Sequence, residues 1–259
     1  MTTLTISESA ASARAATSNR LLAIVRLHFV SPMTTIIVPW MILGFIFLVN
    51  LAIWVIIFTS VTNDQDRNDA QEGLSWSGAS FYIFVYMLFV AIQAINLTFP
   101  FAQGYGVTRR DFYLGTSIYF VLLSAMYAAG LTVLSLIEDA TDGWGLGGHM
   151  FTSIYFGVGE WYVRFGLFFT IFVFFFFVGA AFAAVYVRWR ANGMIALWAA
   201  ITVLIVALIA LVTLTDSWPT VGTWFVDTGV NGVILWSLLP TALAALTGYF
   251  VLRKATPRN

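Results

Sequence analysis

The chain has 259 residues, of which 60% are hydrophobic and 9% are charged, and its 12 basic residues balance its 12 acidic residues. This composition excludes an ordinary soluble domain, and the balanced charge without a basic block argues against a protein that binds nucleic acid. The sequence contains no cysteine, so disulfides, thiolate metal sites and thiol nucleophiles are excluded.

Six apolar stretches follow one another along the sequence, and each is long enough to cross about 30 Å of hydrocarbon as a helix. They lie at 35–60, 79–100, 113–136, 161–187, 193–214 and 230–251. We therefore predict an all-α, polytopic membrane protein whose six-span transmembrane domain covers residues 35–252. Residues 1–34 are predicted to form a tail with an interfacial amphipathic helix, and residues 253–259 a second short tail.

Charged residues sort to opposite sides of the membrane that these spans define. One side holds most of the basic residues: Arg14, Arg20, Arg26, Arg109, Arg110, Arg188, Arg190, Arg253, Lys254 and Arg258. The other side holds most of the acidic residues: Asp64, Asp66, Asp69, Glu72, Glu138, Asp139, Asp142, Glu160, Asp216 and Asp227. Because short basic loops resist translocation, we predict that the basic side and both termini are cytoplasmic.

A short helix is predicted to begin near Asn19, with Ser18 or Asn19 as its cap, and to end before Pro32. Arg20 and Arg26 lie away from its apolar face. That face is formed by Leu21, Leu22, Val25 and Phe29. Such a helix favours the inner membrane interface, with its arginines toward lipid headgroups. The alternative is a frayed tail that carries a few apolar residues.

The connections between the later spans have distinct compositions. Residues 61–78 are predicted to form a polar outer loop, and the Gly-rich, aromatic segment 137–160 is predicted to lie along or dip into the outer leaflet. Glu160 and Arg164 are four residues apart on a helix and are predicted to form an ion pair. Residues 216–227 are predicted to form a short outer loop, with a re-entrant or interfacial hairpin as an alternative.

Span four is rich in phenylalanine, which lipid contact or packing between spans explains without a ligand. The sequence from Arg188 to Gly193 predicts a tight inner turn, so spans four and five are expected to be neighbours.

Several chemistries are excluded by what the sequence lacks. Lys254 is the only lysine, so no phosphate-binding loop and no retinal Schiff base within a span is possible. His28 and His149 fall on opposite sides of the membrane and cannot share a metal or a haem. We therefore predict no catalytic residue, no metal site and no cofactor bound by this chain.

The most distinctive local sequence connects the second and third spans. Pro100 is predicted to end span two, and Gly104 and Gly106 to allow a tight backbone path. Thr108 is a suitable cap for a new helix.

Arg109, Arg110 and Asp111 would then lie in the first turn of a short cytoplasmic helix across the ends of spans two and three. Tyr105 and Val107 would be exposed before it. Such an element could dock into a groove on a soluble partner. The alternative is a plain turn whose two arginines only fix the topology.

The segment Gln103-Gly-Tyr-Gly-Val-Thr-Arg-Arg-Asp-Phe-Tyr-Leu-Gly-Thr116 resembles the loop between spans two and three of permease subunits of type-2 ABC exporters. The matching residues are Gly106, Thr108, Arg109, Arg110 and Phe112. The six spans, the interfacial N-terminal helix and the chain length extend the likeness. One feature departs from many members, because here the longer outer segment lies between spans three and four rather than between spans five and six.

The resemblance implies an ATP-driven exporter in which this chain forms a dimer with a second copy or a homologue. Two separate ATPase subunits would hold ATP and Mg, in a cell membrane that is expected to be a bacterial plasma membrane. The implied substrates are hydrophobic or amphipathic: lipids, lipid-linked glycans, drugs or peptides. The implied ATPase-coupling residues are Gly104, Tyr105, Gly106, Val107, Thr108, Arg109, Arg110, Asp111 and Phe112.

Polar side chains within spans are often functional, and Asn50, Gln93 and Asn96 are therefore candidates for a substrate path. Ordinary hydrogen bonding between spans is the alternative for each of them. The main alternative function is a non-transporting membrane assembly or immunity protein. A secondary transporter is disfavoured, because the span interiors lack evident ionisable residues that would couple ions.

Overall fold

The computed structural model describes residues 19–30, 32–156 and 159–255, which form helices and short connections without a strand. Ser18, a predicted cap, lies outside these residues. A helix at 19–28 comes first. It is followed by η1 (Met33–Ile37), α2 (Val38–Ser60), α3 (Asp64–Ser75), η2 (Ala79–Phe81), α4 (Tyr82–Gly104), α5 (Arg109–Ala140), η3 (Gly143–Gly147), η4 (Ile154–Phe156), α6 (Trp161–Leu214) and α7 (Trp218–Arg253).

Long apolar helices dominate the described part of the chain. Five helical stretches there are long and apolar enough to cross a membrane: Met33–Ser60, Gln65–Gly104, Arg109–Ala140, Trp161–Leu214 and Ile234–Arg253. The prediction of an all-α protein is confirmed, and the long apolar helices fit a multi-pass membrane protein.

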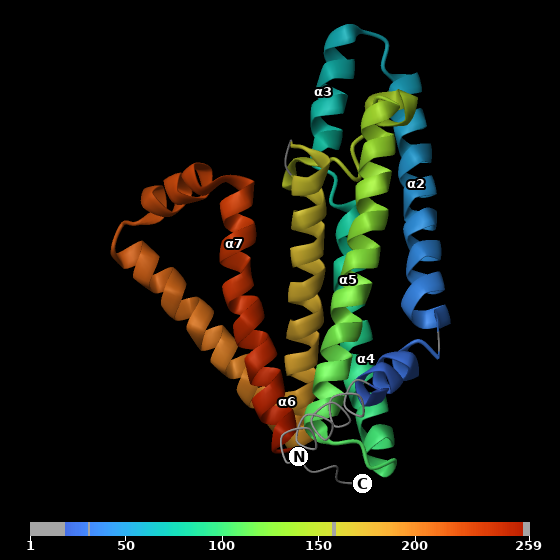
Figure 1. The fold of residues 1–259 in the computed structure, drawn as a ribbon. Coiled ribbons are helices and arrows are strands. Elements are labelled where there is room, and N and C mark those ends of the chain that lie inside the picture. Colours follow the sequence, from blue (N-terminus) through green and yellow to red (C-terminus); the bar gives the residue numbers. More distant parts are fainter. Residues whose placement is uncertain (1–18, 31, 157–158, 256–259) are drawn as a thin grey trace, which may run out of the picture.

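The helices α2, α4, α5 and the first half of α6 run side by side as a bundle (Figure 1). One end of this bundle holds α3 and η3, and we call it the acidic end. The opposite end holds the connection from α4 to α5, the middle of α6 and the last turn of α7, and we call it the basic end (Figure 1). The second half of α6 and α7 diverge from the bundle toward the acidic end (Figure 1).

The long helix α6 is interrupted at Arg190, whose backbone angles (φ 54°, ψ −143°) are not helical. The tight turn predicted before the fifth apolar stretch is thus present. Gly193 is required there, because a Cβ atom on it would lie 2.5 Å from Cβ of Trp189. The rings of Phe182 and Trp198 meet across the turn at 5.8 Å. The two halves of α6 are therefore neighbours at the turn and separate beyond it (Figure 1).

A second interruption lies in α7 at Gly229, whose φ of 60° favours glycine. The residues before it, from Trp218, are helical and mostly exposed, so the loop predicted at 216–227 is wrong over most of its length, and the alternative of an interfacial or re-entrant hairpin stays a prediction. Asp216 adopts the left-handed conformation (φ 48°) between α6 and α7, and this residue makes the turn.

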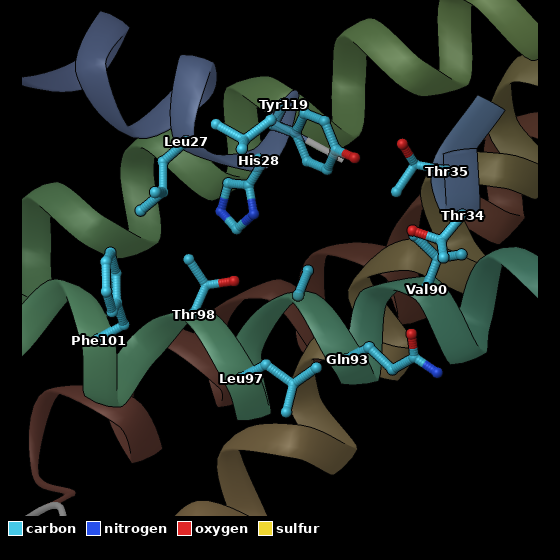
Figure 2. Close-up of a pocket in the computed structure, with 12 residues that line it drawn as sticks. Leu27, His28, Thr34, Thr35, Val90, Gln93, Leu97, Thr98, Phe101 and Tyr119 are labelled. Carbon is cyan, nitrogen blue, oxygen red and sulfur yellow. The ribbon is translucent and has the colours of Figure 1, made fainter. Parts of the chain in front are cut away.

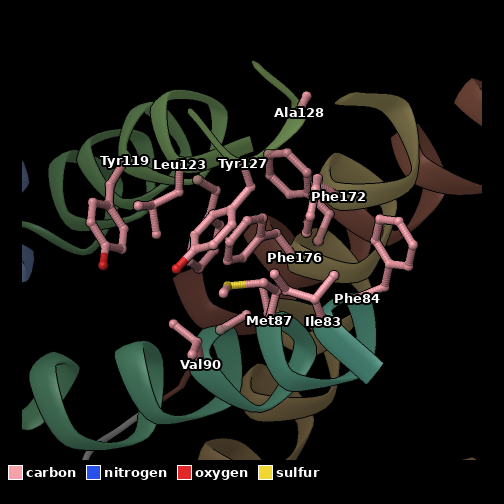
Figure 3. Close-up of a cluster of buried hydrophobic side chains, with 14 of the residues drawn as sticks. Ile83, Phe84, Met87, Val90, Tyr119, Leu123, Tyr127, Ala128, Phe172 and Phe176 are labelled. Carbon is pink, nitrogen blue, oxygen red and sulfur yellow. The ribbon is translucent and has the colours of Figure 1, made fainter. Parts of the chain in front are cut away.

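Phenylalanine side chains of α6 form much of the core (Figure 3). Phe172 packs against Phe84 of α4 with ring centroids 4.7 Å apart, and Phe176 stacks on Phe120 of α5 at 4.9 Å. Phe172 and Phe176 are fully buried. Of the two explanations for the phenylalanine-rich span, packing between helices therefore applies to these two residues.

Two tyrosines attach the start of α2 to the rest of the bundle. Pro39 has no N–H, so it cannot continue the pattern of the π-helical turn η1, in which the Val38 N–H donates to the carbonyl five residues before it. The Tyr127 hydroxyl donates to the Thr35 carbonyl at 2.7 Å, and the Tyr86 hydroxyl donates to the Thr34 carbonyl at 3.0 Å. Side chains of α5 and α4 thus hold backbone carbonyls just before α2 by hydrogen bonds that an apolar medium strengthens.

The acidic end is more ordered than the sequence predicted. The segment predicted as a polar loop contains α3, which Asn63 caps by accepting the Asp66 N–H at 2.7 Å. Asparagine is among the best N-cap residues, and the cap was not recognised within a polar run.

The connection from α5 to α6 directs some of its aromatic residues into the bundle and others outward. Phe151 and Phe156 are buried, whereas Tyr155 is 49% exposed, and the prediction that this segment lies along or dips into the outer leaflet stays a prediction. Arg164 pairs with Asp139 at the end of α5, and the predicted ion pair with Glu160 is wrong. The fold brings the end of α5 to Arg164, whereas Glu160 is exposed.

Candidate functional site: the connection between α4 and α5

The helix α4 continues through Pro100 to Gly104, so the predicted end of the span at Pro100 is wrong by one turn. A proline inside a helix removes one hydrogen bond, here to the carbonyl of Asn96, without necessarily ending the helix. Neighbouring helices support such interruptions in membrane proteins. The connection therefore begins at Tyr105.

A closed C-terminal turn ends α4. Gly106 adopts the left-handed conformation (φ 75°), and its N–H donates to the Gln103 carbonyl at 3.0 Å. The Val107 N–H reaches back to the Ala102 carbonyl at 3.1 Å. These two bonds and the glycine define a Schellman motif. The Gln103 side chain adds a bond from Nε2 to the Val107 carbonyl at 2.9 Å, so the backbone of the connection is fixed at both ends of this turn.

Thr108 caps the next helix, as predicted, and its hydroxyl accepts the Asp111 N–H at 3.1 Å. That helix is α5 itself, so the separate short helix predicted across the ends of two spans is wrong. Arg109, Arg110 and Asp111 occupy the first turn of α5. The apolar run that starts at Phe112 continues the same helix, and no residue there ends it.

The two arginines have different environments. Arg109 Nη1 donates to the Arg253 carbonyl at 3.0 Å and so satisfies a carbonyl at the end of α7. Arg110 is exposed and has no hydrogen bond or ion pair with any described residue. Of the other predicted coupling residues, Phe112 is buried against Phe99, with ring centroids 5.2 Å apart. Val107, predicted to be exposed, is half-buried against the core.

The helix at 19–28 lies beside this connection and packs against the start of α5. Ile24 and Val25 are buried, whereas Leu22, predicted for the packed face, is 52% exposed. Arg20 and Arg26 are exposed, in agreement with the prediction. Of the other residues predicted for this face, Leu21 and Phe29 are half-buried, so only Leu22 departs from the prediction.

The close approach of this helix to α5 depends on Gly115, where a Cβ atom would lie 2.8 Å from Cβ of Ile24. His28 is buried beside it, with Nε2 3.0 Å from the Thr116 hydroxyl and its ring stacked on Tyr119 at 4.8 Å. Burial lowers the pKa of His28 to about 4, so the imidazole is neutral near pH 7.

Acidification is expected to release the helix at 19–28. The pKa of His28 is about 4 when the helix is packed on α5 (docked) and 6.5 when it is released (free). Between pH 4 and pH 6.5 the imidazole is therefore protonated more fully in the free state than in the docked state. The docked state is fully favoured above pH 6.5, and it loses roughly 3 kcal/mol as the pH falls through this range. Because the chain has no cysteine, a spin label on Leu22→Cys reports this helix alone.

The label should become more mobile as the pH falls from about 7.5 to about 4.5. In the same background, His28→Gln keeps a hydrogen-bonding side chain that does not titrate, and its label mobility should not change with pH. Equal pH dependence in both proteins would show that His28 does not control docking.

A groove of about 620 Å³ separates the helix at 19–28 from the connection. The ring of Tyr105 stands at its edge, 76% exposed and 4.8 Å from the ring of Phe101. The groove is lined by Arg20, Ala23, Ile24, Leu27, Phe101, Ala102, Tyr105, Gly106, Val107, Thr108 and Asp111. Five of the predicted coupling residues therefore line a groove at the basic end.

A second cavity, of about 470 Å³, adjoins this groove through Leu27 and Phe101 (Figure 2). Of the predicted substrate-path residues, Gln93 lines it and is exposed. Asn96 is half-buried and lines neither cavity, and its Oδ1 has no hydrogen-bond donor among the described residues. Asn50 donates to the Ile46 carbonyl of its own helix at 2.9 Å. The three residues are thus not brought together.

Sequence reasoning missed the residues that the N-terminal helix contributes to these cavities. His28 lies four residues after Ile24, a spacing that places both side chains on one helix face. That spacing was the available signal. Thr98 and Tyr119 carry no such signal in the sequence, because they line the cavity only through the packing of α4 and α5 against the N-terminal segment.

Comparison with known proteins does not assign the chain to a family. No protein-family model, no curated protein and no solved structure matches it.

Proposed function

We propose that this chain is the six-span permease subunit of an ATP-driven ABC exporter in a bacterial plasma membrane. In this proposal the break at Arg190 divides α6 into the fourth and fifth spans. The basic end and both termini face the cytoplasm. A separate ATPase subunit docks on the connection between α4 and α5, and a second permease copy or homologue completes the transporter. The transported molecule is hydrophobic or amphipathic.

The observation that carries the proposal is the exposed pair Tyr105 and Arg110 on a backbone held by a Schellman motif and a Thr108 cap. A docking element must be exposed to its partner and rigidly attached to the helices that it moves. The connection joins α4 and α5 directly and reaches α7 through Arg109. A force applied here would therefore act on three helices. Coupling requires that ATP binding favours one arrangement of these helices over another.

Removing the exposed side chains while keeping the fold tests this proposal. Tyr105→Ala with Arg110→Ala is expected to abolish co-purification of the ATPase subunit with the tagged chain, because both side chains are exposed and Arg110 makes no described polar contact. Arg109→Ala is a poor test, since it also removes the bond to the end of α7. Arg26→Ala, an exposed arginine on the N-terminal helix, is the matched control.

The expected partner is a soluble chain with a phosphate-binding loop, recovered with the wild type and with Arg26→Ala. Recovery of membrane partners alone from the wild type would favour the non-transporting assembly or immunity protein. Undiminished ATPase binding by the double variant would refute docking at this connection.

A further inference from the structure

The cavity of about 470 Å³ lies between the N-terminal segment and α4, and its volume is in the range of small-molecule sites. Its wall combines apolar and hydrogen-bonding side chains (Figure 2). Leu27 and Leu97 are apolar, whereas Gln93 and Thr98 are polar. None of its lining residues is an arginine, a lysine or a carboxylate.

The cavity opens along an exposed, apolar side of α4. Leu97 and Val30, which both line it, are 72% and 77% exposed. Figure 2 shows Thr98 of α4 opposite His28 of the N-terminal helix, so polar groups from two elements face the same space. An occupant could therefore enter from the surrounding lipid and find hydrogen-bonding groups inside.

We propose that this cavity binds one neutral amphipathic molecule from the lipid, with a hydroxyl or amide headgroup near Gln93 and Thr98 and an alkyl chain against Leu27 and Leu97. A charged headgroup is disfavoured because its burial without a counter-ion costs several kcal/mol. A purely apolar molecule would displace water from Gln93 and Thr98 without replacing its hydrogen bonds. The site is independent of ATPase docking, since its polar residues lie outside the connection between α4 and α5.

The test uses the purified full chain in lipid nanodiscs and a monoacylglycerol that carries a photoactivatable diazirine in its alkyl chain. Labelling should be saturable and should map to peptides that contain Leu27, Leu97 or Phe101. Ala94→Trp places a large side chain inside the cavity, and it should weaken saturable labelling about tenfold. Ala207→Trp, on the exposed second half of α6, is the matched control and should leave labelling unchanged.

Headgroup charge is tested by competition with molecules of the same alkyl length. Unlabelled monoacylglycerol should displace the probe, while an alkyl sulfate and an alkyl trimethylammonium should compete about tenfold less well. Equal competition by either charged molecule would overturn the assignment of a neutral ligand. Labelling that is not saturable, or that Ala94→Trp leaves unchanged, would show only general contact with lipid and would overturn the site.

Discussion

Replacing Glu138 with leucine is expected to destabilise the acidic end of the bundle by roughly 4 kcal/mol, because several buried donors lose their acceptor. The Glu138 carboxylate is 1% exposed and accepts the N–H groups of Met150, Phe151 and Thr152 at 2.8 to 3.1 Å. It also accepts the indole N–H of Trp144 at 2.9 Å. Leucine fits the space in volume but accepts none of these bonds.

The measurement is the free energy of unfolding in a mixed-detergent titration, followed by tryptophan fluorescence. Glu160→Leu is the matched control, because Glu160 lies at the same end, is exposed and has no described side-chain bond; its stability should change little. The stability of Glu138→Gln should fall between those of the two leucine variants. Its amide keeps one acceptor oxygen, but its NH₂ group faces backbone N–H groups that are also donors. Equal stability of the Glu138→Leu and Glu160→Leu proteins would contradict this account.

The second large effect is expected at Gly179, where α6 crosses α4. A Cβ atom there would lie 2.5 Å from the Leu88 carbonyl oxygen and 2.9 Å from Cβ of Ala91. The Leu88 carbonyl oxygen is a backbone atom, so it can move aside only if the whole of α4 moves. Gly179→Leu is therefore expected to separate α4 from α6 and to cost about 3 kcal/mol or more, in the upper range for overpacking.

Gly166→Leu provides the control on the same helix, because nothing lies within 4 Å of a Cβ atom at Gly166. Thermal unfolding of the two purified variants in the same detergent measures the difference. The Gly179 variant should unfold at a clearly lower temperature than the wild type, and the Gly166 variant close to it. A Gly179 variant as stable as the Gly166 variant would show that the two helices do not approach this closely.

Both predictions concern features that the sequence did not reveal. The sequence places Glu138 only on the acidic side, because its backbone donors lie twelve or more residues further along the chain. Gly179 stands in an apolar run where lipid contact and helix contact look alike. Burial of a carboxylate and close approach of two helices both depend on which segments meet in space.

Within the connection between α4 and α5, local signals predicted local structure well. Thr108 caps a helix, and Gly106 takes the left-handed turn that lets Val107 bond back to α4. These features involve residues fewer than six positions apart, so sequence spacing is enough to place them. Which side chains are available to a partner was not predictable, because Arg109 bonds to a residue at the other end of the chain.

The sequence by itself determined that the chain is helical, that its helices are long and apolar enough to cross a membrane, and where two of its turns fall. These follow from composition and from the conformational preferences of Gly, Pro and Thr, which act within a few residues. Only the tertiary structure decided that His28 of the N-terminal helix is buried against α5 and that Arg164 pairs with Asp139. It also decided that the second half of α6 and α7 diverge from the bundle. The physical reason is that an apolar span can face lipid or protein on any side, so hydrophobicity alone does not select its partners.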